Sequence, residues 1–277
     1  MNLNWIESVL YGFISGLSEF LPISSQAHQQ IFLHILGSDQ RDPVRDLFVN
    51  IALLCSIFTA CRSLIDQIRR DSKQRYHSRR GQHHSSHRLL DLKLIQNASI
   101  PLMLAMLLLS FFRKTSVNLI PISLLLLLNG TVIFIASRTL QGNKDARSMS
   151  FLDSTIIGSL GALSIFPGLS RVGLTTSSAI VRGADKQQAL NWSLVISIPA
   201  LVLLTGLNLI SAFTYTEGIH LWTNLFTYIL SSLGAYIGGY LSIITMRLIA
   251  SNFDFSGFAF YSWGAALFTF IIYLTVV

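Results

Sequence analysis

Charged residues are scarce in this sequence: of its 277 residues only 12% are charged, whereas 51% are hydrophobic. An average soluble domain is about 25% charged, and so few charges cannot cover the surface of a soluble protein of this length. Cysteine is also rare, with Cys55 and Cys61 as the two in the chain. This excludes a disulfide-stapled module, and we interpret both as buried free thiols. The class that remains is a polytopic helical membrane protein.

Six apolar runs are long enough to cross a membrane, by the rule of about 20 apolar residues per helix. The predicted fold is therefore all-α, a single membrane domain over residues 1–277. The six spans are expected at Leu47–Arg62, Ile95–Phe112, Leu119–Ala136, Leu190–Phe213, Leu221–Met246 and Gly257–Val277.

Two further apolar stretches are interrupted by proline. Trp5–Ile23 contains Pro22, and Ile156–Phe166 ends at Pro167. Because proline lacks the N–H that a helix needs and clashes with the preceding turn, each helix should break there. A broken apolar segment that is too short to cross predicts a re-entrant helix–loop–helix hairpin.

The two broken stretches resemble each other. The first contains Leu-Ser-Glu-Phe-Leu-Pro-Ile-Ser-Ser from Leu17 to Ser25, and the second contains Leu-Ser-Ile-Phe-Pro-Gly-Leu-Ser from Leu163 to Ser170. Each is followed by three predicted spans. Interrupted helices in matching positions of two halves are typical of an inverted repeat, with the site where the interruptions meet. We expect the repeats at about residues 1–137 and 150–277.

The basic residues are distributed unevenly. Nine of the 20 Lys and Arg lie between Arg62 and Lys93, which favours contact with anionic lipid head groups over nucleic acid binding. If both hairpins are re-entrant, fifteen basic residues lie on one side and four on the other. The positive-inside rule then places the basic loop, at about residues 63–93, in the cytoplasm and both termini outside.

Charged residues inside membrane segments are costly, so they are functional candidates. Glu19 and Arg171 meet this criterion, with His28 as a third titratable group. The structural alternative is a buried ion pair that only joins the two halves. Because apolar residues often replace such pairs without loss of stability, we favour a functional role.

Hydroxyls and glycines surround these charges: Ser24, Ser25, Ser170, Thr175 and Thr176, with Gly168 and Gly173. A broken helix presents unpaired N–H groups, and glycine lets a ligand approach them closely. Arginine adds a planar fork that matches phosphate oxygens. The pattern predicts a phosphate site at membrane depth.

The same residues resemble a known family. The segment from Gly16 to His28, Gly-Leu-Ser-Glu-Phe-Leu-Pro-Ile-Ser-Ser-Gln-Ala-His, is similar to the first motif of the undecaprenyl-diphosphate phosphatases of the bacitracin-resistance type. The segment from Pro167 to Thr175, Pro-Gly-Leu-Ser-Arg-Val-Gly-Leu-Thr, is similar to their second motif. The resemblance implies six spans with two re-entrant hairpins in a bacterial plasma membrane, and an active site that faces outward. It also implies hydrolysis of undecaprenyl diphosphate to the monophosphate, which recycles the lipid carrier for cell-wall synthesis and gives resistance to bacitracin.

By position, the resemblance implicates six residues: Glu19, Ser25, His28, Ser170, Arg171 and Thr175. This chain departs from the family pattern at Ser15, where the family has an earlier glutamate, and at Gly161 and Val172. Glu19 is thus the single carboxylate of the two motifs. We expect a divalent cation, Mg²⁺ or Ca²⁺, to bind through Glu19 together with the substrate diphosphate, and only weakly without it.

The predicted activity is that of a membrane hydrolase acting on a polyprenyl diphosphate. Arg171 and the backbone amides would hold the diphosphate, and Ser25 or a water that it positions would attack the terminal phosphorus. Either Glu19 or His28 would be the general base. A phosphoseryl intermediate and direct hydrolysis both stay open. The rival function is a transporter or flippase of a phosphorylated polyprenyl lipid, and a third is a catalytically inactive paralogue.

The oligomeric state stays open. Gly234 and Gly238, four residues apart in the fifth predicted span, are typical of close helix packing, either within the bundle or at the seam of a homodimer. We favour packing within the bundle.

Overall fold

The computed structural model describes residues 3–38, 41–66, 87–112, 118–140, 142–146, 148–214, 221–252 and 254–276. Within these ranges all regular elements are helical, and the all-α prediction is confirmed. Most of the predicted basic loop, residues 67–86, lies outside the described residues. In chain order the helices are α1 (Trp5–Glu19), α2 (Ser25–Ile35), α3 (Pro43–Ala60), α5 (His87–Ser110), α6 (Leu119–Arg138), α7 (Phe151–Ala162), the short 3-10 turn η1 (Leu163–Ile165), α8 (Arg171–Val181), α9 (Lys186–Thr214), α10 (Leu221–Asn252) and α11 (Ser256–Val276).

Six of the described helices are long and apolar enough to cross a membrane, as predicted. The first begins at Pro43 rather than at Leu47, because Asp42 caps it: its carboxylate accepts hydrogen bonds from the backbone N–H groups of Val44 and Arg45 at 2.9 and 3.2 Å. The six apolar segments are Pro43–Ala60, Leu92–Ser110, Leu119–Arg138, Lys186–Thr214, Asn224–Ala250 and Ser256–Thr275.

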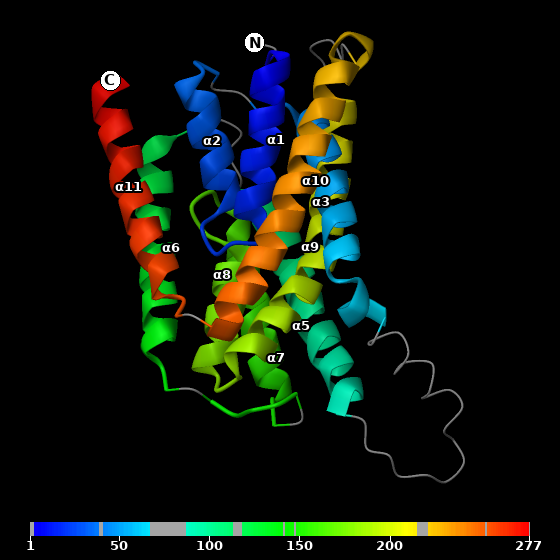
Figure 1. Ribbon diagram of the computed structural model, residues 1–277, viewed down its shortest axis with the longest axis vertical. Coiled ribbons are helices and arrows are strands. Elements are labelled where there is room, and N and C mark those ends of the chain that lie inside the picture. The colour runs from blue at the N-terminus through cyan, green and yellow to red at the C-terminus, as the bar shows by residue number, and fades with distance from the viewer. Residues whose placement is uncertain are drawn as a thin grey trace.

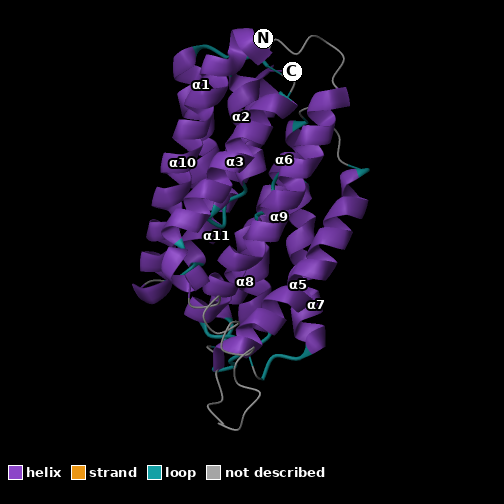
Figure 2. Ribbon diagram, turned by 90° about the vertical axis from the view of Figure 1, so that its right-hand side faces the viewer, coloured by secondary structure: helices purple, strands orange, loops and turns teal. Residues whose placement is uncertain are grey.

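The helices form one elongated bundle (Figure 1). Both termini lie at the same end, as an even number of spans requires. The α1–α2 pair occupies the half of the bundle next to the termini, and the α7–α8 pair occupies the opposite half (Figure 2). The two short pairs thus enter the bundle from opposite ends, with their turns near its middle.

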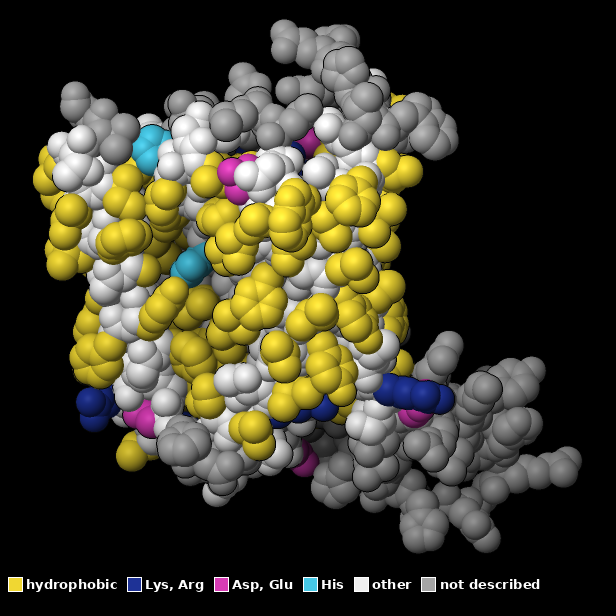
Figure 3. Space-filling model, turned by 45° about the horizontal axis from the view of Figure 1, so that its top comes forward, with side chains coloured by type: hydrophobic (Ala, Val, Ile, Leu, Met, Phe, Trp, Pro, Cys, Tyr) yellow, Lys and Arg dark blue, Asp and Glu magenta, His cyan; other side chains and the backbone are white. Residues whose placement is uncertain are grey.

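An apolar belt crosses the face of the bundle that Figure 3 shows. Hydrophobic side chains cover the middle of the face shown, and most Lys, Arg, Asp and Glu side chains lie towards its edges. Many large apolar side chains are exposed, among them Leu108, Phe111, Leu124, Phe213, Phe226 and Leu274. Such a surface matches lipid rather than water. The chain is a multi-pass membrane protein.

The four short helices cannot span a bilayer singly. The longest, α1, has 15 residues, which at 1.5 Å per residue makes it about 22 Å long. The hydrocarbon core is about 30 Å thick. This length agrees with re-entrant hairpins, but their depth in a membrane stays a prediction.

Both hairpins begin with the same kind of cap. At the start of α1, the Asn4 side chain and the Glu7 carboxylate each accept the other's backbone N–H, at 2.9 and 2.8 Å. Ser150 and Asp153 form the same capping box at the start of α7. These reciprocal hydrogen bonds satisfy N–H groups that a helix start leaves unpaired.

Each hairpin turns at the proline that the sequence marks. Pro22 follows α1, whereas Pro167 follows α7 and its 3-10 turn. Gly168 has a φ of 114°, a conformation that side chains disfavour. Ser24 and Ser170 then cap α2 and α8, because each hydroxyl accepts a backbone N–H from the first turn of its helix.

Glycines let α1 and α10 pack backbone to backbone. Gly12 and Gly16 of α1 face α10, and Gly234 and Gly238 of α10 face α1. A Cβ at Gly238 would lie 2.8 Å from the backbone nitrogen of Leu17. Packing within the bundle, which we favoured for these two α10 glycines, is therefore confirmed.

The two cysteines are both free, but they differ in environment. Cys61 is buried as predicted, whereas Cys55 is exposed, so the prediction is wrong for Cys55. Cys61 follows Cys55 by six positions, which is about one and two-thirds turns of a helix. This separation places the two side chains on different faces.

Candidate active site

The two hairpin turns contact each other directly. Ser24 Oγ accepts a hydrogen bond from the Gly168 N–H at 3.0 Å, and Ser170 Oγ donates to the Leu21 carbonyl at 3.2 Å. Gly173 allows the close approach, because a Cβ there would lie 3.2 Å from the proline ring of the first turn. Segments more than 140 residues apart are thus joined at one point.

Asn129 of α6 holds both turns from the side. Its Nδ2 donates to the Pro22 carbonyl at 3.0 Å, and its Oδ1 accepts from the Ser170 N–H at 2.9 Å. The Nδ2 also donates to Ser262 Oγ of α11 at 3.2 Å. The side chain is fully buried. A single amide therefore fixes the position of one hairpin relative to the other.

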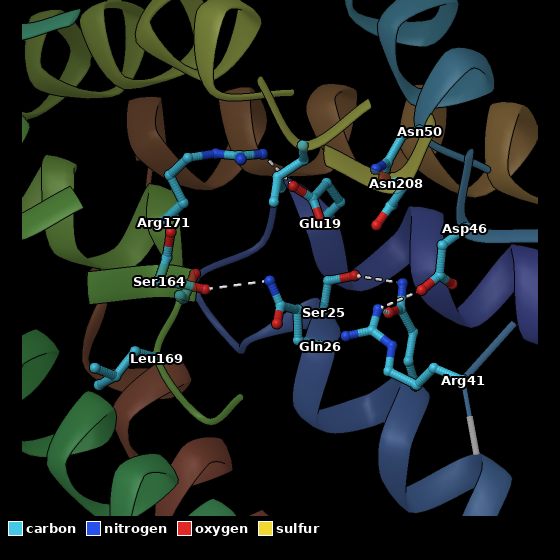
Figure 4. Close-up of a pocket in the computed structure, with 13 residues that line it drawn as sticks. Glu19, Ser25, Gln26, Arg41, Asp46, Asn50, Ser164, Leu169, Arg171 and Asn208 are labelled. Carbon is cyan, nitrogen blue, oxygen red and sulfur yellow. Dashed lines mark hydrogen bonds and ion pairs between the residues drawn. The ribbon is translucent and has the colours of Figure 1, made fainter. Parts of the chain in front are cut away.

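A polar cavity lies next to the joined turns (Figure 4). The space inside it and its open mouth together is about 530 Å³. Helices α1, α2, α3, α8 and α9 contribute to its walls. The lining residues are Glu19, Ser25, Gln26, Gln29, Arg41, Asp46, Asn50, Ser164, Leu169, Ser170, Arg171, Leu204 and Asn208.

Glu19 and Arg171, the two predicted charges, meet in this cavity. A guanidinium nitrogen of Arg171 contacts the Glu19 carboxylate in an ion pair, and the two side chains are 4% and 12% exposed. Arg171 Nε donates to Ser197 Oγ of α9 at 3.3 Å. Glu19 ends α1 and Arg171 begins α8, so the pair joins the two hairpins across the point where their helices break.

Ser25, the predicted nucleophile, also lines the cavity. It is the first residue of α2, one position after the Ser24 cap. Its hydroxyl donates to the Ser15 carbonyl at 3.1 Å and accepts from Gln29 Nε2 at 3.3 Å. Ser25 also lies close enough to Glu19 to interact with its carboxylate. The predicted nucleophile and one of the two predicted bases are thus neighbours in one cavity.

A second ion pair, which the sequence analysis missed, forms the opposite wall. Arg41 Nη2 lies 2.8 Å from Asp46 Oδ2 and donates to Gln29 Oε1 at 3.0 Å. The Tyr11 hydroxyl donates to the other Asp46 oxygen at 2.5 Å. Arg41 is one of the four basic residues expected on the outer side, with Arg45, Arg113 and Lys114. Nothing in its sequence context indicates that it folds back into the bundle.

Two asparagines in apolar helices complete the polar lining. Asn50 belongs to α3 and Asn208 to α9. Both interrupt runs predicted as spans, and a polar side chain inside a span is itself a signal of function or of helix contact. That signal was present for Asn129 as well.

Five predicted site residues do not line the cavity. The Ser24 hydroxyl and the Gly168 and Gly173 amides take part in the turn and cap hydrogen bonds. The Thr175 hydroxyl donates to the Arg171 carbonyl at 2.8 Å within α8. These hydrogen bonds hold the turns and helix starts in place, and direct contact of the four residues with phosphate stays a prediction.

His28 is the fifth. Its Nδ1 lies 2.8 Å from the Ser24 carbonyl oxygen, its Nε2 lies 2.8 Å from the Tyr261 hydroxyl, and the His28 and Tyr261 rings stack with centroids 5.7 Å apart. One ring nitrogen thus faces the cap of its own helix and the other faces α11. The histidine lies outside the cavity lining, whereas Glu19, the other predicted base, lines the cavity next to Ser25.

The carboxylates of the cavity do not form a cation site by themselves. Glu19 is paired with Arg171, and Asp46 is paired with Arg41. Among the described residues no three His, Cys, Asp or Glu side chains cluster as metal ligands. These residues do not fit a cation that is resident without substrate, and binding of a cation through Glu19 together with the substrate diphosphate stays a prediction.

The fold and the cavity define a polytopic helical membrane protein with two buried arginine–carboxylate pairs around one polar site. The family described as Bacitracin resistance protein BacA matches residues 8–268. The chain belongs to this family, and the resemblance inferred from its motifs is confirmed.

Curated relatives cover most of the chain. A Bacillus cereus protein named Undecaprenyl-diphosphatase 3 is 28% identical over 265 residues, which are 96% of each chain. A protein named Undecaprenyl-diphosphatase from Carboxydothermus hydrogenoformans is 25% identical over 261 residues, 94% of each chain. Its namesake from Prochlorococcus marinus is 31% identical over 241 residues, 83% of this chain and 88% of the relative.

Proposed function

We propose that this chain hydrolyses undecaprenyl diphosphate, a polyprenyl diphosphate lipid, to the monophosphate and phosphate. Family membership and relatives named undecaprenyl-diphosphatase support this activity. The single observation that carries it is the meeting of Glu19, Ser25 and Arg171 in one cavity. In a bacterial plasma membrane, the reaction recycles the lipid carrier for cell-wall synthesis and gives resistance to bacitracin.

The first step is an exchange of partners at Arg171. A phosphate group that enters the cavity competes with Glu19 for the guanidinium, since both are anions that pair with arginine. Phosphate binding at Arg171 releases the carboxylate. The Glu19 side chain is then free to accept a proton next to Ser25.

The second step is attack on the terminal phosphorus. Glu19 takes the proton from the Ser25 hydroxyl, or from a water held by Ser25, and the oxygen forms the new bond to phosphorus. The bond between this phosphorus and the bridging oxygen breaks, and the lipid monophosphate leaves. Arg171 stabilises the charge on the phosphoryl oxygens, where phosphoryl transfer needs it most. Water hydrolyses the phosphoserine if one forms.

The cavity is assigned to the outer face of the membrane. It includes Arg41, which lies just before α3 at the end of the bundle that carries both termini. The basic residues Arg138, Lys144, Arg182, Lys186 and Arg247 belong to segments at the other end, which the positive-inside rule places in the cytoplasm.

Cysteine labelling tests this orientation in a variant without Cys55 and Cys61. A cysteine at Gly37 should react with an impermeant maleimide added to intact cells, and one at Lys144 only after the cells are opened. Labelling of both from the same side would overturn the orientation and the paired hairpins.

Phosphate release from undecaprenyl diphosphate by the purified protein in detergent tests the activity. The wild type should turn over, and Glu19→Gln should lose at least about 100-fold, because its amide cannot accept the proton. Glu7→Gln is the matched control, since Glu7 lies in the same helix but serves only its cap. Absence of phosphate release, with transfer of the lipid across liposomes intact, would overturn hydrolysis in favour of the flippase.

A further inference from the structure

Arg41 has hydrogen-bonding capacity that the protein does not use. A guanidinium carries five N–H donors. Nη2 binds Asp46 and Gln29, but Nε and Nη1 are buried and have no hydrogen-bond acceptor among the residues that the structure describes. The side chain is only 11% exposed. Buried charged donors without acceptors are costly, which indicates that this surface of the guanidinium serves a ligand.

The position of Arg41 shows what kind of ligand that is. Arg41 and Arg171 lie on opposite sides of the cavity, with Glu19 and Ser25 between them (Figure 4). Hydrogen bonds run from Ser25 through Gln29 to Arg41, so one wall links the nucleophile to the second guanidinium. Two cations on either side of a nucleophile suit a molecule with two linked anionic groups.

The second pair is held more firmly than a surface ion pair would be. Asp46 is buried and accepts from the Tyr11 hydroxyl, and the guanidinium of neighbouring Arg45 lies over the Tyr11 ring at 5.5 Å. This network fixes Asp46, which in turn fixes Arg41. The guanidinium is therefore preorganised, and a ligand need not order it on binding.

We propose that Arg41 is a second phosphate-binding residue, so that each phosphate of a diphosphate pairs with its own arginine. The inference rests on the proposed function and deepens it. A diphosphate engages Arg41 and Arg171 together, whereas the lipid monophosphate or free phosphate engages one of them. Arg41 thereby distinguishes substrate from product and favours product release.

Steady-state kinetics of Arg41→Gln test this role. A hydrogen-bonded charge pair with phosphate contributes binding free energy, and its loss should raise KM for undecaprenyl diphosphate about 10-fold to 100-fold. The value of kcat should change by less than about three-fold. Arg41→Lys should give an intermediate KM, because an ammonium keeps the charge without the planar fork. Arg247→Gln is the matched control: its guanidinium is partly buried and donates to the Ala60 carbonyl at 3.0 Å, and it neither lines the cavity nor contacts Arg41 or Asp46.

Inhibition by soluble anions separates ligand binding from a structural effect. Methylenediphosphonate, a diphosphate that cannot be hydrolysed, should inhibit the wild type at concentrations at least about 10-fold below those of inorganic phosphate. In Arg41→Gln this advantage should disappear, with inhibition by phosphate unchanged. If Arg41 only joins α3 to α2, the ratio of the inhibitory concentrations of phosphate and methylenediphosphonate stays at the wild-type value in Arg41→Gln and in Arg41→Lys. That result would overturn the proposal.

The proposed function can fail separately. If the wild type releases no phosphate, hydrolysis is wrong, and calorimetric binding of methylenediphosphonate to the wild type and to Arg41→Gln still decides the role of Arg41. Equal affinity of the two proteins would overturn the second phosphate site. Weaker binding by the variant would support the second phosphate site, as part of the headgroup site of a lipid transporter.

Discussion

Replacing Asn129 by leucine should separate the two hairpins without removing any residue of the cavity. Leucine has the same branching as asparagine and is somewhat larger, but it has no polar atoms. The Pro22 carbonyl and the Ser170 N–H would lose the partners that they have at 3.0 and 2.9 Å. Both groups lie at a fully buried site, where water cannot replace the lost partners.

The magnitude follows from these two hydrogen bonds. Side-chain hydrogen bonds between membrane helices contribute about 0.6 kcal/mol on average and at most about 1.7 kcal/mol. The loss of two should therefore lower the stability by about 1–3 kcal/mol, with the buried backbone groups favouring the upper part of that range. Activity should fall further than stability alone predicts, by about 10-fold to 100-fold. The reason is that Glu19 and Arg171 belong to different hairpins, and a displacement of about 1 Å is costly at a reacting centre.

Two assays measure the effect. Thermal unfolding in detergent reports stability, and phosphate release from undecaprenyl diphosphate reports turnover at a temperature where the variant is folded. Ser123→Ala is the control, because Ser123 is a buried polar residue of the same helix whose hydroxyl donates within α6, to the Ile120 carbonyl. Wild-type turnover in Asn129→Leu would refute the reasoning, since the hairpins would then hold their relative position without this amide.

Three further predictions address the ion pair, the helix packing and the cation. Arg171→Lys should lose at least about 100-fold in turnover, or roughly 2.7 kcal/mol, because a point charge cannot replace a planar fork; near-wild-type turnover would remove Arg171 from the site. Gly238→Leu should lower stability in thermal unfolding by about 1–3 kcal/mol through overpacking against α1, whereas Gly264→Leu, with open space around it, should not; equal stabilities would contradict the close packing. Excess chelator should reduce wild-type activity until Mg²⁺ is restored, and Ser15→Glu, one helical turn before Glu19, should lower the Mg²⁺ concentration for half-maximal activity. Full activity in chelator would mean that the arginines neutralise the diphosphate alone.

Patterns that depend on neighbouring residues could be predicted from the chain alone. The six spans follow from runs of apolar residues, since a helix must be about 20 residues long to cross a bilayer. The breaks at Pro22 and Pro167 follow from the missing N–H of proline. Glu19 and Arg171 were identified because a charge inside an apolar segment is costly wherever that segment lies.

The roles of Ser24, Gly168, Gly173 and Thr175 could not be predicted in the same way. Gly173 and Thr175 bind partners three and four residues away within their own segment. Ser24 instead binds Gly168 of the other hairpin, and His28 contacts Tyr261 of α11. Spacing along the chain contains no information about these last two contacts, because their residues are more than 140 positions apart.

Only the tertiary structure decided which charges and amides surround the cavity. Arg41 and Asp46 lie near a helix start, where charged side chains are ordinarily solvated, yet both are directed into the bundle. Asn129 had to lie beside both turns before its amide could join them. The sequence by itself determined the helices, their breaks and the two charges inside broken segments, since each depends on local covalent geometry and on the cost of charge in lipid. The second guanidinium and the link between the hairpins depend on which helices become neighbours, and that is settled by the packing of the whole bundle.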